Sequence, residues 1–325
     1  MRSMAFTLED VRSRTYKARD AWWTVLLVDP LASRLVKFTA NRTGITPNQL
    51  TTGALLLGLG AGACFATAES TWLLVGALLY HLSFVLDCMD GKIARLKGTG
   101  SVFGAWLDYI FDRVRVLACS IALMGGLYAA TGNVAFVWTG LAVVFLDMLR
   151  YLDALEIYKV RSQMRSRLVK AQTRAAELEL ATRRLPSESE MDSMLGGDYD
   201  KLISELPKPH ELMQQGFHKR FPWYARVRNG LLRGRIRPHL ISGIEFQMSV
   251  FIIAPVLAVL IGPTAVIWTA ALAGAGLLFF ELVIIYKFYL SSLDFARVSA
   301  ELEAKIAEYE AQLPAESEVP LGRAV

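Results

Sequence analysis

The fold of this chain is decided by residues 87–112, which read DCMDGKIARLKGTGSVFGAWLDYIFD. The stretch is mainly apolar but contains four carboxylates, and these are Asp87, Asp90, Asp108 and Asp112. An unpaired carboxylate in apolar surroundings is energetically expensive, whether the surroundings are a protein core or a lipid bilayer. We therefore expect the folded chain to bring compensating charge to these four side chains.

The spacing of the carboxylates predicts how this happens. Asp87 and Asp90 are three residues apart, and Asp108 and Asp112 are four apart, so on helices each pair projects from one face. The short turn between them would bring the two faces together. Four carboxylates that close repel one another unless divalent cations lie among them. Hard oxygen ligands select Mg²⁺, Mn²⁺ or Ca²⁺ over zinc or copper, so the stretch predicts a divalent metal site.

Small residues and cations surround the acids. The small residues are Gly91, Ala94, Gly98, Gly100 and Gly104, and they leave room for a ligand beside the metals. Arg95 and Lys97 supply positive charge suited to a phosphate. The alternative is a set of interhelical ion pairs to Arg95, Arg113 and Arg115. That alternative does not require the small residues.

The whole pattern resembles the complete signature of the CDP-alcohol phosphotransferase family, with every defining position filled at the family's spacing. The positions that carry the resemblance are Asp87, Asp90, Gly91, Ala94, Arg95, Gly104, Asp108 and Asp112. The resemblance implies a transferase that uses Mg²⁺ or Mn²⁺, with two ions, and that works as a homodimer.

The resemblance also implies roles for single residues. The metals would be held by Asp87, Asp90 and Asp108, and Asp112 would be the general base and would also contact a metal. The nucleotide and its phosphates would be bound by Asn48, Thr51, Asp90, Gly91, Ala94, Arg95 and Gly104. Asn48 and Thr51 enter because the sequence TPNQLT at 46–51 resembles the family motif that opens the first span.

In the family, an acceptor hydroxyl attacks the β-phosphorus of a CDP-linked alcohol, CMP leaves, and a phosphodiester forms. A site at the membrane interface favours CDP-diacylglycerol as donor and thus a role in phospholipid biosynthesis. A soluble CDP-polyol donor with a polyol phosphate acceptor is the alternative. Arginines near the fifth span suggest a phosphorylated acceptor, held by Arg150, Arg235 and Arg237, although a purely topological role explains them too.

Composition places this site in a membrane. The chain has 325 residues, of which 54% are hydrophobic and 20% charged, and its mean hydropathy is +0.35. Such a mixture is typical of a membrane protein with substantial polar segments. The net charge of +5 comes with basic residues clustered near the ends of apolar runs. Anionic lipid explains this clustering better than nucleic acid, so we expect membrane lipids and no nucleic acid as partners.

We therefore predict an all-α integral membrane protein. An interfacial amphipathic helix at about 20–42, interrupted at Asp29-Pro30, precedes six transmembrane helices. Thr46 caps the first of these, with Pro47 in its first turn. The six are predicted at about 46–68, 71–94, 102–127, 134–148, 246–261 and 265–288.

The segments between the spans complete the predicted organisation. Basic residues gather on one side of the spans, which by the positive-inside rule puts both termini and residues 87–112 in the cytoplasm, at a bacterial cytoplasmic membrane. The predicted divisions are 1–45 as N-terminus and interfacial helix, 46–153 as spans one to four, 154–244 as a cytoplasmic charged insertion, 245–290 as spans five and six, and 291–325 as a cytoplasmic C-terminal helix and tail.

The insertion itself has three parts. It begins with a basic helix that extends the fourth span and continues through an acidic linker at about 186–209. It ends in an arginine- and aromatic-rich stretch at 217–240, expected to bind anionic headgroups or an anionic acceptor. The C-terminal helix is predicted at about 294–313.

Two other function classes fit parts of the pattern. Carboxylates within a membrane also mark ion pathways, so a metal-ion transporter is one. Three further acids, Asp147, Glu245 and Glu281, are scattered near the ends of the spans, which disfavours transport. An inert scaffold is the other, and the intact signature argues against it.

Overall fold

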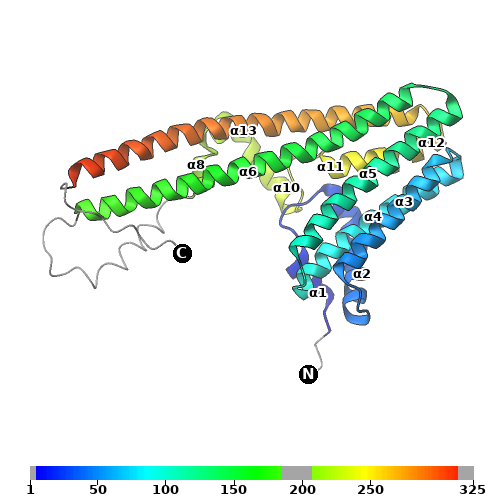
Figure 1. Cartoon of the computed structure of the whole chain (residues 1–325), viewed down its shortest axis with the longest axis horizontal. Coiled ribbons are helices and arrows are strands. Elements are labelled where there is room, and N and C mark those ends of the chain that lie inside the picture. The colour runs from blue at the N-terminus through cyan, green and yellow to red at the C-terminus, as the bar shows by residue number, and fades with distance from the viewer. Residues whose placement is uncertain (1–4, 184–206, 314–325) are drawn as a thin grey trace. The chain divides into compact units, whose positions relative to one another are not determined.

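The computed structural model describes residues 5–183 and 207–313, and within these ranges the backbone forms helices and no strand (Figure 1). Six helices are long and apolar enough to cross a membrane, which confirms the predicted number and the all-α class. They are Pro47–Ala66, Ser70–Lys97, Val102–Thr131, Ala135–Thr182, Gly243–Ile261 and Ala265–Gln312.

The chain divides into two compact units. The first contains residues 1–153 and 226–283, and the second contains 154–225 and 284–325. Two long helices, α6 (Ala135–Arg183) and α13 (Ala265–Gln312), contribute to both units. Residues 87–112 lie in the first unit.

Three helices form the centre of the first unit. They are α3 (Pro47–Ala66), α4 (Ser70–Lys97) and α5 (Val102–Thr131), and α3 packs against both of the others (Figure 1). Glycines allow the close approach: a Cβ at Gly76 would lie 2.6 Å from the Phe65 ring. Small residues at helix contacts are typical of membrane bundles, where close packing replaces the hydrophobic effect between helices.

Local signals fix where α4 and α5 end and begin. Gly98 ends α4 in the left-handed conformation, with φ of 66°, which favours glycine because it has no Cβ. Ser101 begins α5, because its hydroxyl accepts a hydrogen bond of 2.9 Å from the Gly104 amide. The turn between the two carboxylate pairs therefore spans only a few residues, as their sequence spacing predicts.

The N-terminal segment also packs onto α4. It consists of α1 (Leu8–Thr15), a π-helical turn η1 (Thr24–Val28) and α2 (Asp29–Arg42). The interruption predicted at Asp29-Pro30 is wrong, because Pro30 lies in the first turn of α2, directly after the π-helical turn. A proline is tolerated in a first turn, where its missing amide hydrogen costs no helical hydrogen bond. Three apolar side chains of this helical stretch, Leu26, Leu27 and Phe38, are exposed.

The fifth span also contains a π-helical turn directly before a proline. It is built from α11 (Gly243–Met248), a π-helical turn η2 (Ser249–Ile253) and α12 (Ala254–Ile261). Pro255 follows the π-helical turn, again in the first turn of the next segment. A π-helical turn shifts the hydrogen-bond register and so accommodates the proline within a continuous span.

The second unit has a small core of its own. Four buried apolar side chains form this core, and they are Met164, Leu168, Met213 and Val298. They are enclosed by the C-terminal parts of α6 and α13 together with α8 (Pro209–Leu212) and α9 (Gln215–Arg220). Another helix, α10 (Pro222–Arg233), follows α9. The predicted acidic linker lies mostly outside the described residues.

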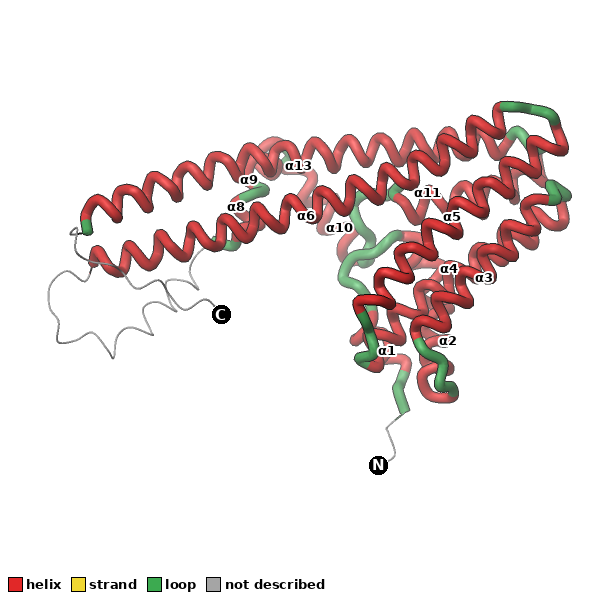
Figure 2. The backbone as a smooth tube through the Cα atoms, viewed as in Figure 1, coloured by secondary structure: helices red, strands yellow, loops and turns green. Residues whose placement is uncertain are grey.

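The sequence pattern predicts two helices, at 265–288 and 294–313, and this separation is wrong. They form the single helix α13, because residues 289–293 contain neither glycine nor proline to break it (Figure 2). The basic helix predicted after the fourth span is likewise continuous with that span in α6, as expected.

Candidate active site

Three of the four carboxylates converge. Asp87 and Asp90 project from α4 and Asp108 from α5, and one carboxylate oxygen of each lies within 4.8 Å of the others. Asp90 is buried, with 6% of its surface exposed, and the other two are partly buried. Within the described residues, neither Asp90 nor Asp108 forms an ion pair. Asp87 is the one member with an ion pair among the described residues, to Arg115 at 3.5 Å. Three clustered oxygen donors with a single arginine partner fit a divalent ion such as Mg²⁺ or Mn²⁺.

Thr51 orients one of these carboxylates. Its hydroxyl donates a 2.5 Å hydrogen bond to Oδ2 of Asp90 and lies 3.1 Å from the carbonyl oxygen of Pro47. The contact joins the first turns of α3 to α4. Hydrogen bonds of this kind orient a metal-ligating carboxylate and tune its affinity for the ion.

Asp112 is held differently. Nη2 of Arg113 lies 2.7 Å from its Oδ2, Nη2 of Arg115 contacts its Oδ1, and the Tyr151 hydroxyl is 3.4 Å from Oδ2. It is not part of the three-carboxylate group. The ion-pair alternative from sequence thus applies to Asp112 and in part to Asp87, whose Oδ1 lies 3.5 Å from Nη1 of Arg115. The converging geometry applies to Asp87, Asp90 and Asp108.

A polar network on the far side of Arg113 was missed by sequence reasoning. Arg113 also pairs with Asp147 of α6, and the amide of Gln247 donates a 2.9 Å hydrogen bond to Oδ1 of Asp147. The guanidinium group lies 3.4 Å above the centre of the Tyr151 ring. The available signal was Asp147 itself, because a carboxylate within an apolar span requires a partner.

The residues expected to bind nucleotide lie near the N-terminal ends of α3 and α5 and in the C-terminal part of α4. A Cβ at Gly104 would lie 2.8 Å from the Asn48 side-chain oxygen, so this glycine allows Asn48 close to α5. A Cβ at Gly91 would lie 3.4 Å from the Arg95 guanidinium, and Ala94 is partly buried one turn along the same helix. Arg95 is exposed, and its Nε donates a 3.1 Å hydrogen bond to the Thr15 carbonyl.

The three arginines expected to bind the acceptor each have a carboxylate partner. Nε of Arg150 lies 3.2 Å from Glu281 and 3.0 Å from the Ser242 hydroxyl. Arg237 pairs with Glu245 at 2.5 Å. These contacts place both arginines in internal pairs and leave their assignment to the acceptor as a prediction.

Arg235 belongs to a second network that sequence reasoning missed. Its Nη2 lies 3.0 Å from Oδ2 of Asp29, and Nζ of Lys92 lies 2.9 Å from Oδ1 of the same carboxylate. The side chains of Asp29 and Lys92 are 3% and 5% exposed. A buried pair of this kind links α2 to α4 two residues from Asp90. The signal was Lys92, a lysine between a glycine and an isoleucine in an apolar helix.

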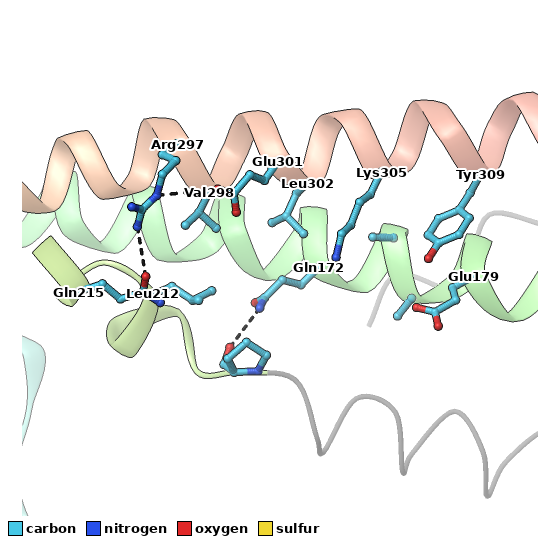
Figure 3. Close-up of a pocket in the computed structure, with 13 residues that line it drawn as sticks. Gln172, Glu179, Leu212, Gln215, Arg297, Val298, Glu301, Leu302, Lys305 and Tyr309 are labelled. Carbon is cyan, nitrogen blue, oxygen red and sulfur yellow. Dashed lines mark hydrogen bonds and ion pairs between the residues drawn. The ribbon is translucent and has the colours of Figure 1, made fainter.

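A cavity of about 420 Å³ lies in the second unit (Figure 3). Arg297, Glu301 and Lys305 project into it from α13, and Gln172 projects from α6, where its amide donates to the Pro207 carbonyl at 3.0 Å. The cavity contains none of the residues expected to be catalytic. We therefore do not place the active site in this cavity.

Comparison with known proteins matches residues 44–179 to a family model described as CDP-alcohol phosphatidyltransferase. The matched range contains all four carboxylates, Asn48 and Thr51. The resemblance stated from residues 87–112 is thereby confirmed.

Curated relatives match over part of this range. A phosphatidylinositol phosphate synthase of Corynebacterium glutamicum is 35% identical over 89 residues, which is 27% of this chain and 37% of that protein. A bifunctional IPC transferase and DIPP synthase of Aquifex aeolicus is 40% identical over 70 residues, 21% of this chain and 15% of that protein. An archaetidylinositol phosphate synthase of Pyrococcus horikoshii is 42% identical over 71 residues, 22% of this chain and 36% of that protein. Each alignment therefore spans well under half of the relative.

Proposed function

We propose that this chain, whose residues 44–179 form a CDP-alcohol phosphatidyltransferase domain, catalyses metal-dependent transfer of a substituted phosphate group from a CDP-linked alcohol to an acceptor hydroxyl, releasing CMP. The observation that carries the proposal is the convergence of Asp87, Asp90 and Asp108 on one point between α4 and α5. The domain match supports the reaction class, and the carboxylate oxygens support a divalent ion.

The residues of the chain divide the chemistry between them. Asp87, Asp90 and Asp108 would hold Mg²⁺ or Mn²⁺, which supplies charge neutralisation for the pyrophosphate and the leaving CMP. Arg95, exposed beside Gly91, is suited to pair with the donor phosphates. The acceptor oxygen forms a bond to the β-phosphorus, the bond from that phosphorus to CMP breaks, and the acceptor proton passes to a carboxylate oxygen of Asp112.

We infer a lipid-linked donor of the CDP-diacylglycerol type and a phosphorylated polyol acceptor. Six helices that can cross a membrane support the first part. The relatives named phosphatidylinositol phosphate synthase and archaetidylinositol phosphate synthase support the second, since both names describe an inositol phosphate attached to a lipid. We further propose that the enzyme is a homodimer with its active site on the cytoplasmic side of a bacterial membrane, as the family resemblance and the charge pattern suggest.

Metal transport is the less favoured function. Three acids near the ends of the spans and outside the signature pair with arginines, and these are Asp147, Glu245 and Glu281. A carboxylate neutralised by an arginine offers a passing ion little attraction. Transport without CMP release would nevertheless be a distinct experimental result.

The test is CMP release by the purified full-length protein in lipid nanodiscs. Donors are CDP-diacylglycerol and a soluble CDP-polyol, each with Mg²⁺ or Mn²⁺, and acceptors are inositol, inositol phosphate and glycerol phosphate. We expect CMP with CDP-diacylglycerol and inositol phosphate. Asp112→Asn should lower kcat by at least about 100-fold, as for the loss of a general base.

The matched control is Glu156→Gln, which removes an exposed carboxylate paired with Lys159 and should leave kcat within about two-fold, as surface substitutions usually do. Absence of CMP with every donor, or full activity in Asp112→Asn, would overturn the proposal. CMP only from the soluble donor would support the reaction and replace the donor.

A further inference from the structure

Helix α10 has an exposed apolar face. None of its residues is buried, and two apolar side chains one turn apart, Trp223 and Val227, are 58% and 49% exposed. They project from the same side of the helix, because residues four apart share a face. Both side chains therefore present apolar surface outside the protein core.

Cations flank this apolar face on both sides. At about 100° per residue, Arg226 and Arg233 lie on one flank, Arg228 lies on the other, and Asn229 lies opposite the apolar face. Arg226, Arg233 and Asn229 are exposed, and Arg228 is partly buried. The helix is therefore amphipathic, with arginines along the border between its apolar and polar sides.

The charge around α10 is of one sign. Residues 212–244 contain seven cations and no aspartate or glutamate. Two of the seven are paired inside the protein, Arg235 with Asp29 and Arg237 with Glu245. The other five have no carboxylate partner among the described residues, and they are Lys219, Arg220, Arg226, Arg228 and Arg233. This excess of positive charge fits an anionic surface.

The C-terminal end of α10 is fixed beside the start of the fifth span. The Arg235 carbonyl accepts a 2.8 Å hydrogen bond from the Asp20 amide, and Nε1 of Trp22 donates a 2.9 Å hydrogen bond to the Leu240 carbonyl. Only residues 234–242 separate α10 from α11, which begins the fifth span. Tryptophans and basic residues at the end of a span are typical of the membrane–water interface. A membrane surface is thus within reach of α10.

We propose that α10 lies in the plane of the membrane surface, with Trp223 and Val227 in the apolar layer and the flanking arginines on the headgroups of anionic lipids. An exposed apolar face bordered by basic residues is typical of interfacial helices. Basic clusters next to a span bind anionic lipid. Nucleic acid would engage the cations and leave the apolar face in water, so it fits α10 less well. This binding does not depend on the proposed transfer reaction.

Nitroxide labels on the full-length protein in lipid nanodiscs test this orientation. Val227→Cys places a label on the apolar face, and Asn229→Cys places one on the opposite face. The protein without an added cysteine gives the background signal from the three native cysteines. Electron paramagnetic resonance measures how often each label collides with oxygen, which enters lipid, and with a nickel complex, which stays in water.

The lipid composition separates anionic headgroups from lipid in general. In an equal mixture of phosphatidylcholine and phosphatidylglycerol, the label at 227 should be shielded from nickel and accessible to oxygen, while the label at 229 stays accessible to nickel. In phosphatidylcholine alone, the label at 227 should become accessible to nickel, because the arginines then have no anionic headgroups.

Substitutions identify the side chains responsible. Removing one basic residue from an anionic surface weakens binding by about five-fold, so Arg226→Gln combined with Arg233→Gln should expose the label at 227 to nickel in the mixed lipid. Trp223→Gln removes the largest apolar side chain of α10 without changing any charge, and it should also expose the label.

The matched control is Arg167→Gln combined with Lys170→Gln. These are two exposed cations of α6, well beyond the predicted end of the fourth span. This double variant lowers the net charge by the same amount and should leave the label at 227 shielded from nickel.

Three results would overturn the proposal. One is a label at 227 that stays accessible to nickel in the mixed lipid. Another is equal shielding in phosphatidylcholine alone or in the arginine double variant, because anionic headgroups would then have no part in holding α10. The third is shielding in phosphatidylcholine that appears only when inorganic phosphate or RNA is added, which would assign the cations to a different ligand.

Discussion

At the scale of single residues, the hydrogen bond from Thr51 to Asp90 is the most specific contact to the group formed by Asp87, Asp90 and Asp108. The Thr51 hydroxyl lies 2.5 Å from Asp90 and fixes that carboxylate from α3. Thr51→Val keeps the shape of the side chain and removes the donor. The Mn²⁺ Kd should rise by about 10-fold, which is typical for loss of a hydrogen bond to a metal ligand. Calorimetry with the full-length protein measures this change.

The neighbouring threonine supplies the control. Thr52 is exposed, and its hydroxyl bonds the Asn48 carbonyl of its own helix at 2.9 Å. Thr52→Val should leave the Kd within about two-fold, because intrahelical bonds of this kind contribute little. If the two variants weaken Mn²⁺ binding equally, Thr51 has no specific role in orienting Asp90.

Sequence reasoning was most successful where spacing carries the geometry. The i, i+3 and i, i+4 patterns predicted that acids from two helices would meet, and Asp87, Asp90 and Asp108 do. The pattern could not reveal that Asp112 faces two arginines, although Arg113 and Arg115 were named as alternative partners. Whether a carboxylate meets a metal or an arginine depends on side-chain packing across helices. One example is Gly58 of α3, which leaves space for the Arg115 side chain, because a Cβ at Gly58 would lie 2.5 Å from Cδ of Arg115.

At the scale of elements, the turn between α4 and α5 sets how the two carboxylate-bearing faces meet. Gly98 occupies the left-handed region at φ of 66°, and no atom would contact a Cβ there. Gly98→Ala therefore tests conformation alone and should lower the free energy of unfolding by about 1 kcal/mol. Gly98→Asn should lose less, since asparagine tolerates this conformation better. Thermal unfolding in detergent micelles measures both variants.

The control for this turn is Gly125→Ala. Gly125 lies within α5, has no positive φ, and would also meet no atom with an added Cβ. In a helix interior, alanine is favoured over glycine by about 0.5–1 kcal/mol, so this variant should be neutral or stabilising. Destabilisation of both variants by the same amount would mean that the left-handed turn has no special cost.

Helix ends show a second limit of sequence reasoning. Pro30 predicted a break, because a proline inside a helix removes a hydrogen bond. The π-helical turn at Thr24–Val28 precedes it, and the helix continues. A hydrophobic pattern of period 3.6 does not reveal a single widened turn, so the π-helical turn could not be predicted from the sequence. This turn shifts the backbone hydrogen-bond register and so allows Pro30 in a continuous helix.

At the scale of the whole first unit, the buried carboxylate of Asp29 joins three segments far apart in the sequence. Lys92 reaches it from α4, and Arg235 reaches it from the segment after α10. Arg235 itself adopts φ of 61°, a conformation that costs a side-chain-bearing residue about 1–2 kcal/mol. Two backbone hydrogen bonds hold this segment in place. The Asp20 amide donates to the Arg235 carbonyl at 2.8 Å, and the Arg237 amide donates to the Asp20 carbonyl at 2.9 Å.

These contacts predict which substitution destabilises the unit most. Asp29→Asn leaves the buried Lys92 without its carboxylate and should lower the free energy of unfolding by about 3–5 kcal/mol, the usual cost of breaking a buried pair. Arg235→Ala should cost less, about 1 kcal/mol, because Arg235 is 26% exposed. Thermal unfolding of the full-length protein in micelles ranks the two variants. Asp20→Asn, which retains the backbone bonds, serves as the control and should be nearly neutral.

The origin of the loss can be isolated with Lys92→Met. In the Asp29→Asn background this change removes the unpaired buried charge, so it should recover part of the lost stability. Alone, it leaves Asp29 paired with Arg235 and should destabilise. Additive effects of Lys92→Met and Asp29→Asn would show that Lys92 and Asp29 do not depend on each other.

A kinetic measurement on Arg235→Ala tests whether this arginine also binds the acceptor. If it does, the variant should raise the KM for the acceptor and leave the KM for the donor unchanged. Equal changes in the two KM values would mean that Arg235 acts only through Asp29.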